Sequence, residues 1–473
     1  MYRIVLLTIS ICAFMMCQTS KTDVKSASAT GSMANAEKTF TTFCASCHGE
    51  NSDVFAERTW KHGKSRPEII KSITTGYPDL SMPAWGLSLK PQQIEDLADY
   101  FLAAFDRRKN YEFTDKPKSN IFEHTSISVK LDTVVKGLKN PWGMAFLPNG
   151  DMLYTDRDGS FYRLSNGVQT KIEGVPSVLA KGQGGLMDVE LHPKFAENSL
   201  IYLSYSKPKD NTDKSPATTA VMRAKLDGNK LVDGKDIFVA EPYQNTRHHY
   251  GSRIEFDKQG YMFVTVGDRG QHDAKLPQKL DNDMGKVHRL MDDGRVPTDN
   301  PFVNTPNAHG SIWSYGHRNP QGMAMNPNTG VIWAHEHGPR GGDELNIPTK
   351  GKNYGWPVIS FGINYDGTIL TPNNKLDGME QPVTYWVPSL GPSGMTYVTG
   401  DRYKAWKGDI LMGSMRFKYL NRVHMNGNKV ESQEMLLKNI GRVRAVEMGR
   451  DGFIYVAVEE PGYIFRLVPM DKM

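Results

Sequence analysis

The sequence predicts a mainly β protein, a six-bladed β-propeller with a small all-α domain at its N-terminus. Two observations predict the propeller: a polar turn followed by an apolar strand recurs six times, and no long amphipathic helix is evident over the same stretch. A third observation, a Cys-x-x-Cys-His motif followed by a helical pattern, sets residues 33–106 apart. At 473 residues the chain is long enough for two domains, each with its own core.

The repeated unit is a turn, usually ending in glycine, followed by an apolar strand. Six copies indicate six blades, because each blade of a propeller repeats one meander of strands. A β-sandwich would give similar strands, but six like turns favour the propeller. The spacing is widest around the third to fifth copies, so we expect long insertions there, on the kind of loop that often builds a site. The copies are "PNGDMLYTD", "ENSLIYLSY", "KQGYMFVTV", "NTGVIWAHE", "WKGDILMGS" and "RDGFIYVAV", from Pro148, Glu197, Lys258, Asn328, Trp406 and Arg450.

Composition argues against several other classes of protein. Apolar residues make up 39% of the chain and charged residues 23%, which is typical of a globular protein rather than a disordered or membrane-embedded one. The formal net charge is +5, but the basic residues are interleaved with acidic ones and form no block. We therefore expect no nucleic-acid partner.

Residues 1–20 are typical of an export signal. A basic start precedes an apolar run from Ile4 to Met16, which is too short to span a bilayer comfortably. Cys17 lies where a bacterial lipoprotein is cut and acylated, so it is a candidate for a lipid anchor. The bulky Phe14 and Met15 before it leave two alternatives open, cleavage at a small residue and retention as an anchor. We expect an exported protein, periplasmic or held at the membrane as a lipoprotein.

The stretch "FCASCHGE" carries the attachment signal for a c-type haem. Cys44 and Cys47 would form the two thioether bonds, and His48 would ligate the iron. A redox dithiol or half of a zinc site is the alternative for Cys-x-x-Cys, but the adjoining histidine and the lack of another cysteine pair argue against both. Beyond the signal region these are the only two cysteines, so we expect no structural disulfide.

The second iron ligand is expected to be Met82, in the Gly/Pro-bounded loop "YPDLSMPAWG". Ligation by methionine and histidine raises the reduction potential and leaves no open iron position, so this module would carry electrons. The stretch from Pro91 has apolar residues at helical spacing and predicts a closing helix. Residues 33–106 resemble a small class I cytochrome c. Residues 107–126 lack periodicity and predict a linker to the second domain, residues 127–473.

Several polar clusters fall between the strands of the second domain. Singly, each has an ordinary structural explanation, and "HEHGPRGGDE" with His335 and His337 also admits a zinc site as a minority alternative. Several cationic groups alongside a histidine nevertheless suggest an anionic ligand with proton transfer next to it. The candidates are Gln183, His248, His249, Arg318, Asn319, Gln321, Arg416, Arg442 and Arg444.

Eight motifs occur in order along this domain: "GQGGLMDVELHPKF", "GDRG", "MGKVHRL", "VPTDNP", "GHRNPQG", "HGPRGGDE", "KNYGWP" and "GRVRAV". Together they resemble the soluble-type quinoprotein sugar dehydrogenases, the glucose, aldose-sugar and sorbosone dehydrogenases that use pyrroloquinoline quinone (PQQ). The resemblance runs from about Leu138 to Leu467, and its sharpest matches are "GHRNPQG" and the Gly-Pro of "HGPRGGDE". That family is a six-bladed propeller, which agrees with the six repeated turns.

The resemblance implies a role for each candidate. His249 would be the general base that takes the proton of the sugar's anomeric hydroxyl, while the hydride passes to the quinone. Arg318 and Asn319 would bond the quinone oxygens and stabilise developing charge. The carbonyl oxygens of Gly338 and Pro339 would ligate a calcium ion. The cofactor would be held by Gln183, Arg416, Arg442 and Arg444, with Trp386 as a stacking wall.

Two residues depart from the family pattern. His248 stands where the glucose enzymes carry an aspartate beside the catalytic histidine, so the tuning of the base differs. Arg416 stands where they carry a lysine, and a planar guanidinium fork orients a ligand differently from a point charge. The substrate-facing loops also differ from those of the glucose enzymes.

The sequence thus predicts a quinoprotein that oxidises an aldose sugar, or a related alcohol or aldehyde. Electrons would pass to the fused haem and then to a downstream redox protein, either soluble or membrane-bound. A tether between donor and acceptor raises their effective concentration, which gives a reason for the fusion. Two alternatives are a calcium-dependent propeller hydrolase or lactonase, and a non-catalytic ligand-binding propeller joined to an electron carrier.

Overall fold

The computed structural model describes residues 22–48, 52–80, 82–111 and 113–470. The chain divides into two compact units, one of residues 1–50 and 60–103, and one of residues 51–59 and 104–473. No helix among the described residues is long and apolar enough to cross a membrane. The export signal and Cys17 lie outside the described residues.

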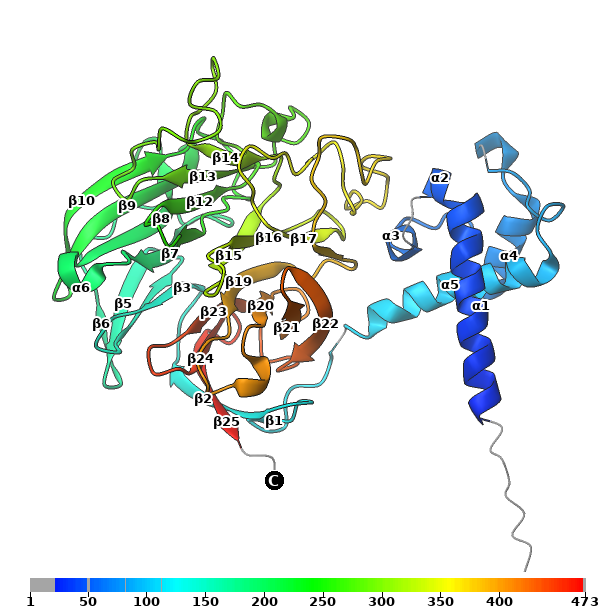
Figure 1. Ribbon diagram of the computed structural model, residues 1–473, viewed down its shortest axis with the longest axis horizontal. Coiled ribbons are helices and arrows are strands. Elements are labelled where there is room, and N and C mark those ends of the chain that lie inside the picture. Colours follow the sequence, from blue (N-terminus) through cyan, green and yellow to red (C-terminus); the bar gives the residue numbers. More distant parts are fainter. Residues whose placement is uncertain (1–21, 49–51, 81, 112, 471–473) are drawn as a thin grey trace, which may run out of the picture. The chain divides into compact units, whose positions relative to one another are not determined.

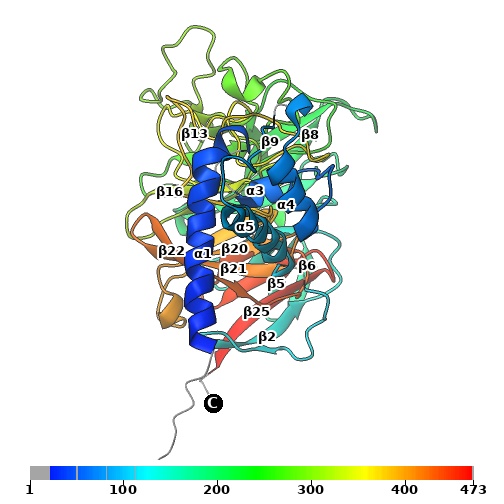
Figure 2. The same cartoon turned by 90° about the vertical axis from the view of Figure 1, so that its right-hand side faces the viewer.

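The first unit is built from helices. Phe40 of α1 packs edge-on against Phe101 of α5, with 5.6 Å between the ring centroids, where the two helices cross (Figure 1). Arg66 of α4 reaches Asp99 of α5 at 2.7 Å, and Figure 2 shows α4 beside α5. The helix predicted from Pro91 is confirmed and extends to Lys109. The helices are α1 (Thr22–Phe43), α2 (Ala45–His48), α4 (Arg66–Thr75) and α5 (Pro91–Lys109), while α3 (Ser52–Ala56) falls in the second unit.

The second unit consists of six antiparallel sheets, which follow one another along the chain (Figure 1). The first is β3 (Pro141–Phe146), β4 (Met152–Asp156), β5 (Ser160–Ser165) and β6 (Val168–Lys171). The second is β7 (Leu186–Leu191), β8 (Leu200–Pro208), β9 (Ala217–Asp227) and β10 (Lys230–Val239). The third is β11 (Ile254–Phe256), β12 (Met262–Val266), β13 (Lys286–Leu290) and β14 (Ile312–Tyr315).

The remaining three sheets complete the set. The fourth is β15 (Pro320–Met325), β16 (Ile332–Glu336), β17 (Asp343–Asn346) and β18 (Thr384–Trp386). The fifth is β19 (Pro392–Tyr397), β20 (Ile410–Ser414), β21 (Tyr419–Asn426) and β22 (Lys429–Leu436). The sixth joins β23 (Val443–Met448), β24 (Ile454–Val458) and β25 (Tyr463–Met470) to β2 (Ser128–Val135) and β1 (Ile121–Phe122), from the start of this unit.

The first strands of the six sheets pack side by side in a closed ring, in the order β3, β7, β11, β15, β19, β23 and back to β3. Because β2 pairs with β25, the beginning and end of the unit share one sheet, which closes the ring. The apolar clusters lie between adjacent blades; one of them buries Leu153, Leu203 and Val189 from the first two sheets. The six-bladed propeller is therefore confirmed.

The six repeats predicted from the sequence are the second strands of the six blades, namely β4, β8, β12, β16, β20 and β24. Their turns join the first strand to the second at one end of each blade. Neighbouring strands of an antiparallel blade run in opposite directions. The opposite end of the blade therefore holds the start of the first strand, the end of the second and the start of the third. We call that opposite end the site face, because the predicted site residues fall on loops there. The widest insertions, residues 291–311 and 347–383, lie in the third and fourth blades.

The predicted linker differs from the structure at both ends. Helix α5 takes residues 107–109, and β1 pairs with β2 through Ile121 and Lys130. Between them, Phe113 packs edge-on against Tyr419 of the fifth blade, with ring centroids 6.1 Å apart. Residues 113–122, which we call the strap, are therefore fastened to the propeller. Aromatic residues within the charged stretch made this possible, although the stretch lacks periodicity.

Candidate active site

A cavity of about 380 Å³ opens at the site face of the propeller. Four arginines and one glutamate line it, so its ionised side chains sum to 4 − 1 = +3. Cationic linings of this kind bind polyanions, and guanidinium forks suit carboxylates in particular. We call it the arginine cavity, and its wall includes Trp142, Arg157, Gln183, Tyr250, Gln321, His337, Arg416, Arg442, Arg444 and Glu459.

Glu459, which follows β24, holds two of the arginines in place. Arg444 donates to Oε1 of Glu459 at 2.7 Å, and Arg442 donates to Oε2 at 3.1 Å. Burial alone would raise the pKa of Glu459, but the two arginines hold that pKa below its ordinary value, so the carboxylate stays charged. Arg442 and Arg444 therefore meet around one carboxylate in the wall of the cavity. Glu459 itself was not predicted as a site residue.

His249 lies on the loop before β11 and is held by a carboxylate. Its Nδ1 lies 2.7 Å from Oδ1 of Asp268, which follows β12. Asp268 also accepts the Trp356 indole N–H at 2.8 Å and the Gly270 backbone N–H at 2.7 Å. An ionised carboxylate only accepts hydrogen bonds, so Nδ1 carries the proton and Nε2 is left as a basic nitrogen.

Both members of this pair have shifted pKa values. Burial, with a further contribution from the nearby Arg318 charge, lowers the pKa of His249 to about 4, although Asp268 acts in the opposite direction. Burial would raise the pKa of Asp268, but the hydrogen bond and charge of His249 and the charge of Arg318 bring it down to about 2. His249 is therefore neutral and Asp268 charged near neutral pH, which is the state that a general base requires.

The backbone of the His249 loop is fixed from two sides. His249 has a φ of 56°, in the left-handed region, and its N–H donates to Oε1 of Gln183 at 2.7 Å. The fully buried Arg269 donates to the carbonyl oxygens of Thr246, His248 and Ala217 at 2.7–2.9 Å. Such a backbone conformation persists only where neighbouring groups hold it. Gln183 and Arg269 supply those contacts.

Arg318 and Asn319 lie on the loop before β15, as a second pair of candidates. Each keeps one buried donor, Nε of Arg318 and Nδ2 of Asn319, with no hydrogen-bond acceptor among the described residues. Their other atoms are occupied, since Arg318 donates to the Gly338 carbonyl at 2.8 Å and Asn319 accepts from the Gly251 N–H at 3.1 Å. A buried donor without an acceptor is costly, so these two atoms indicate a place for a ligand oxygen.

Gly338 and Pro339 line a separate small pocket of about 10 Å³, which has room for one water-sized particle. Glu336 and Glu344 line the same pocket, and burial and the Glu336 charge raise the pKa of Glu344 to about 8. The loop is fixed by the buried Asp343, which accepts the N–H groups of Gly338, Leu390 and Gly391 at 2.6–3.0 Å. Asp343 thus ties this pocket to one wall of the arginine cavity.

Two expectations are not supported by the geometry. Trp386 does not line the arginine cavity; its ring is 5% exposed in the core, and its indole N–H donates to Gln433 at 2.6 Å. A packing role, rather than a stacking wall, follows from these contacts. Among the described residues, no group of three or more His, Cys, Asp or Glu side chains could hold a metal, so the alternative of a zinc site at His335 and His337 finds no ligand set.

The haem motif forms a single helical turn. The N–H of His48 donates to the Cys44 carbonyl at 2.9 Å, which brings the first and last motif residues to one side of the turn. Met82 is pinned by a pair of backbone hydrogen bonds with Tyr77, at 2.8 and 3.1 Å, and the Tyr77 ring stacks on His62. The side chain of Cys47 lies outside the described residues. A methionine held by two backbone hydrogen bonds suits an iron ligand, so these residues fit a c-type haem.

A histidine held by a carboxylate, beside a cationic cavity at one end of a propeller, is an arrangement that suits an enzyme with a polyanionic ligand. Residues 138–466 match the protein family described as "Glucose / Sorbosone dehydrogenase", and residues 31–101 match "Cytochrome C oxidase, cbb3-type, subunit III". The chain belongs to the glucose/sorbosone dehydrogenase family of PQQ-dependent oxidoreductases and carries an N-terminal cytochrome c domain.

Individual relatives agree with this assignment. Aldose sugar dehydrogenase YliI of Escherichia coli K12 is 42% identical over 352 residues, which cover 72% of this chain and 93% of the relative. The apo-form crystal structure of the soluble aldose sugar dehydrogenase from E. coli aligns with a TM-score of 0.69 at 41% identity, over 72% of this chain and all of that one. The PQQ-bound aldose sugar dehydrogenase from Streptomyces coelicolor aligns with a TM-score of 0.60 at 28% identity, over 73% and 99%.

Proposed function

We propose that this chain oxidises an aldose sugar, or a related alcohol or aldehyde, with PQQ bound at the site face and haem c as the electron acceptor. One observation carries the proposal. A neutral histidine, oriented by Asp268, lies on the same face as the two unsatisfied donors of Arg318 and Asn319 and the cationic cavity. The resemblance to aldose sugar dehydrogenases supports the sugar as substrate.

The residues present fit PQQ. The cofactor carries three carboxylates, which match the formal charge of +3 in the arginine cavity. Arg416, Arg442, Arg444 and Gln183 would hold it, together with Arg157, and Arg318 Nε and Asn319 Nδ2 would donate to its quinone oxygens. When bound, the quinone supplies the two-electron, hydride-accepting chemistry that no side chain here provides.

His249 supplies the proton chemistry. Its Nε2 is the basic nitrogen because Nδ1 is committed to Asp268, and it would take the proton of the substrate hydroxyl. Asp268 stabilises the positive charge that the ring then acquires, as a carboxylate next to an imidazolium does. The donors of Arg318 and Asn319 are aimed before the reaction begins, so little reorganisation is needed to stabilise negative charge on an oxygen.

A calcium ion at Gly338 and Pro339 is the third part of the proposal. Carbonyl and carboxylate oxygens are the ligands that calcium prefers, and Glu336 and Glu344 line the same pocket. A nearby divalent cation would also bring Glu344 back to its charged form, since an opposite charge lowers the pKa of a carboxyl.

The haem, covalently held by Cys44 and Cys47 and ligated by His48 and Met82, would receive the electrons one at a time. Sugar oxidation releases two electrons, so two successive transfers to a single haem are required. A downstream soluble or membrane-bound redox protein would then accept them.

Export is a further part of the proposal. It is supported by residues 1–20 and by the c-type haem motif. Cell fractionation, with lipid labelling of the wild type and of Cys17→Ser, distinguishes a periplasmic protein from a lipoprotein. Labelled wild type and unlabelled Cys17→Ser indicate a lipid anchor, whereas absence of label in both contradicts it.

The experiment that tests the function uses the full-length haem protein. It is loaded with calcium and PQQ, supplied with a panel of aldoses, and followed by the haem absorption bands. Haem reduction that requires both quinone and sugar is expected. If no aldose, alcohol or aldehyde reduces the haem of the loaded protein, the proposal is wrong; the same samples are then assayed for lactone hydrolysis, which needs calcium but neither quinone nor haem.

A further inference from the structure

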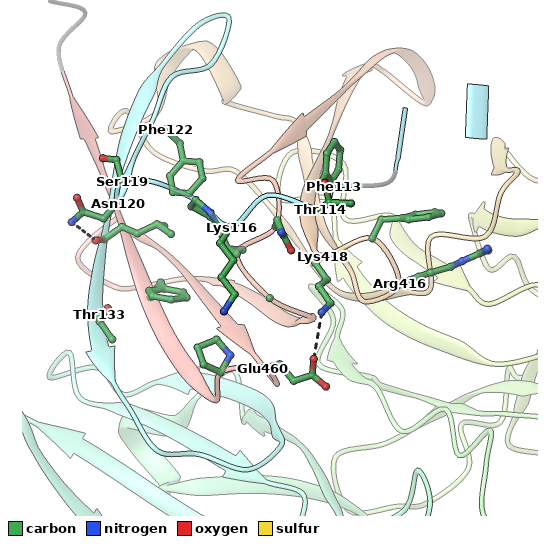
Figure 3. A pocket seen from close by; sticks show the side chains of 18 of the residues that line it. Phe113, Thr114, Lys116, Ser119, Asn120, Phe122, Thr133, Arg416, Lys418 and Glu460 are labelled. Carbon is green, nitrogen blue, oxygen red and sulfur yellow. Dashed lines mark hydrogen bonds and ion pairs between the residues drawn. The ribbon is translucent and has the colours of Figure 1, made fainter. Parts of the chain in front are cut away.

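A second, larger cavity of about 970 Å³ lies between the strap and the fifth and sixth blades (Figure 3). We call it the outer groove. One wall is the strap, including Phe113, Lys116 and Phe122, and the other comprises β2 and the loops around Lys418 and Glu460. The size is at the upper end of small-molecule sites, with room for a ligand of two or three fused rings.

The floor of the outer groove is apolar and formed by buried side chains. Four side chains that line it are each exposed by less than a tenth, Leu131 at 6%, Phe417 at 9%, Ile440 at 7% and Phe465 at 9%. Tyr111, Phe113 and Phe122 add three further aromatic rings to the lining. A floor of this kind favours a flat ring system over a sugar or a free inorganic ion, because burial of apolar surface supplies the binding free energy.

The rim of the outer groove is cationic. Lys116, Arg416 and Lys418 line it with Glu460 as the one acidic side chain of the lining, so the lining carries 3 − 1 = +2. Figure 3 shows the side chain of Lys116 extending into the pocket and that of Lys418 turned toward Glu460. Lys116 forms no ion pair in the part of the chain that the structure describes, and Lys418 has only the exposed Glu460 at 3.5 Å. A surface pair of that kind is weak, so an incoming anion can take the place of Glu460.

We propose that the outer groove is a binding site for an aromatic organic anion, with its rings on the apolar floor and its acidic group between Lys116 and Lys418. One cavity provides both the apolar floor for the rings and the two lysines for the acidic group, and the oxidation of a sugar explains neither feature. The strap supplies Phe113, Phe122 and Lys116 to this lining. Arg416 lines the outer groove and the arginine cavity alike, so the two sites share one wall.

The test measures binding to the full-length haem protein by equilibrium dialysis, with no quinone added, so its result is independent of the proposed function. The probe is 1-anilinonaphthalene-8-sulfonate, and the matched neutral compound is N-phenyl-1-naphthylamine, which has the same rings without the sulfonate. The variants are Lys116→Gln, Lys418→Gln and their double, with Lys235→Gln on β10 as a matched control, because Lys235 is exposed and far along the chain in the second blade.

At the site that Thr133→Trp removes, we expect the anion to bind about tenfold tighter than the neutral compound, as charge-assisted contacts provide. Each lysine substitution should weaken binding by about two- to fivefold and the double by about tenfold, while Lys235→Gln binds as the wild type does. Thr133→Trp, which fills the groove and keeps both lysines, should abolish the site. Equal affinity for the two compounds, or equal affinity in the lysine variants and the control, overturns the proposal. Unchanged binding by a folded Thr133→Trp protein does so as well.

Discussion

Nδ1 of His249 lies 2.7 Å from Oδ1 of Asp268, although the two residues are nineteen positions apart along the chain. They meet because the loop before the first strand of the third blade and the turn after its second strand lie at the same end of that blade. The contact fixes which ring nitrogen carries the proton. Asp268 is itself held in place, since Trp356 and Gly270 donate to the same carboxylate.

Replacing Asp268 by asparagine should remove most of the activity. The amide keeps the shape, but it no longer stabilises the protonated ring, and its NH₂ group can donate to Nδ1 and select the wrong tautomer. We expect the turnover number for sugar oxidation to fall by at least roughly 100-fold, by analogy with other histidine–carboxylate pairs. Steady-state kinetics with the quinone-loaded protein and an artificial electron acceptor measure this.

The control for that variant is Asp273→Asn, since Asp273 lies in the same loop and its side chain is 98% exposed. It should retain wild-type turnover and the same haem spectrum. If Asp268→Asn turned over as fast as Asp273→Asn, His249 would not depend on Asp268 for its orientation.

On the acid side of the pH profile, activity should be lost only at an unusually low pH. Because the pKa of His249 lies at about 4, the ring remains neutral as pH falls from 8 to about 5, and the base is lost only below that. We expect kcat/KM to fall by half near pH 4, not near the ordinary histidine value of about 6.5. The measurement uses saturating artificial acceptor over pH 3.5–8. A half-point near 6.5 would contradict the buried, neutral state of His249.

The blades and several site residues could be predicted from the sequence, because local patterns encode them. Each repeated turn and strand became the second strand of a blade, and the candidates His249, Arg318 and Arg444 lie at the site face. Asp268 and Glu459 were missed as partners, since their contacts arise from strands that meet in space. Both residues come just after one of the repeated strands, and this position is the sequence feature that could have identified them. Trp386 was misplaced because a tryptophan near a glycine-rich loop packs as readily in a core as against a ligand.

The buried guanidinium of Arg269 should act as a positioning group for His249. It contacts three backbone carbonyls and lies over the Tyr250 ring, with 3.7 Å between the guanidinium carbon and the centroid. A lysine cannot reach all three carbonyls. We expect Arg269→Lys to lower the free energy of unfolding by about 2–3 kcal/mol, because it leaves buried acceptors unsatisfied. Thermal unfolding of the propeller measures this.

If Arg269 only stabilised the fold, replacing it would not change the pH at which kcat/KM falls by half. Because Arg269 holds the loop that buries His249, its loss should expose the ring and move the half-point of kcat/KM upward toward 6.5, with turnover reduced more than KM is raised. Arg295→Lys is the matched control, since that side chain is 74% exposed. An unshifted half-point in folded Arg269→Lys would mean that it stabilises the fold without positioning the base.

Replacing Arg444 by glutamine should weaken cofactor binding. The substitution removes one unit of positive charge from the arginine cavity and leaves Glu459 with Arg442 alone. Loss of a charge-assisted contact is worth about 1.5–3 kcal/mol, which predicts a PQQ dissociation constant raised by roughly 10- to 100-fold. Titration of the apo-protein with PQQ measures it, with Arg295→Gln as the control. Equal affinity in the two variants would place the cofactor elsewhere.

Replacing Met82 by alanine should separate sugar oxidation from haem reduction. Met82 belongs to the loop closed by Tyr77 in the first unit and is not one of the propeller residues proposed to handle substrate, so oxidation with an artificial acceptor should proceed at the wild-type rate. Loss of a methionine ligand lowers the haem reduction potential, because thioether ligation favours the reduced iron. We therefore expect a lower midpoint in a potentiometric titration and slower reduction of the haem by sugar. Leu87→Ala, a 99% exposed position in the same segment, is the control and should leave the midpoint unchanged. An unchanged midpoint in Met82→Ala would mean that another group ligates the iron.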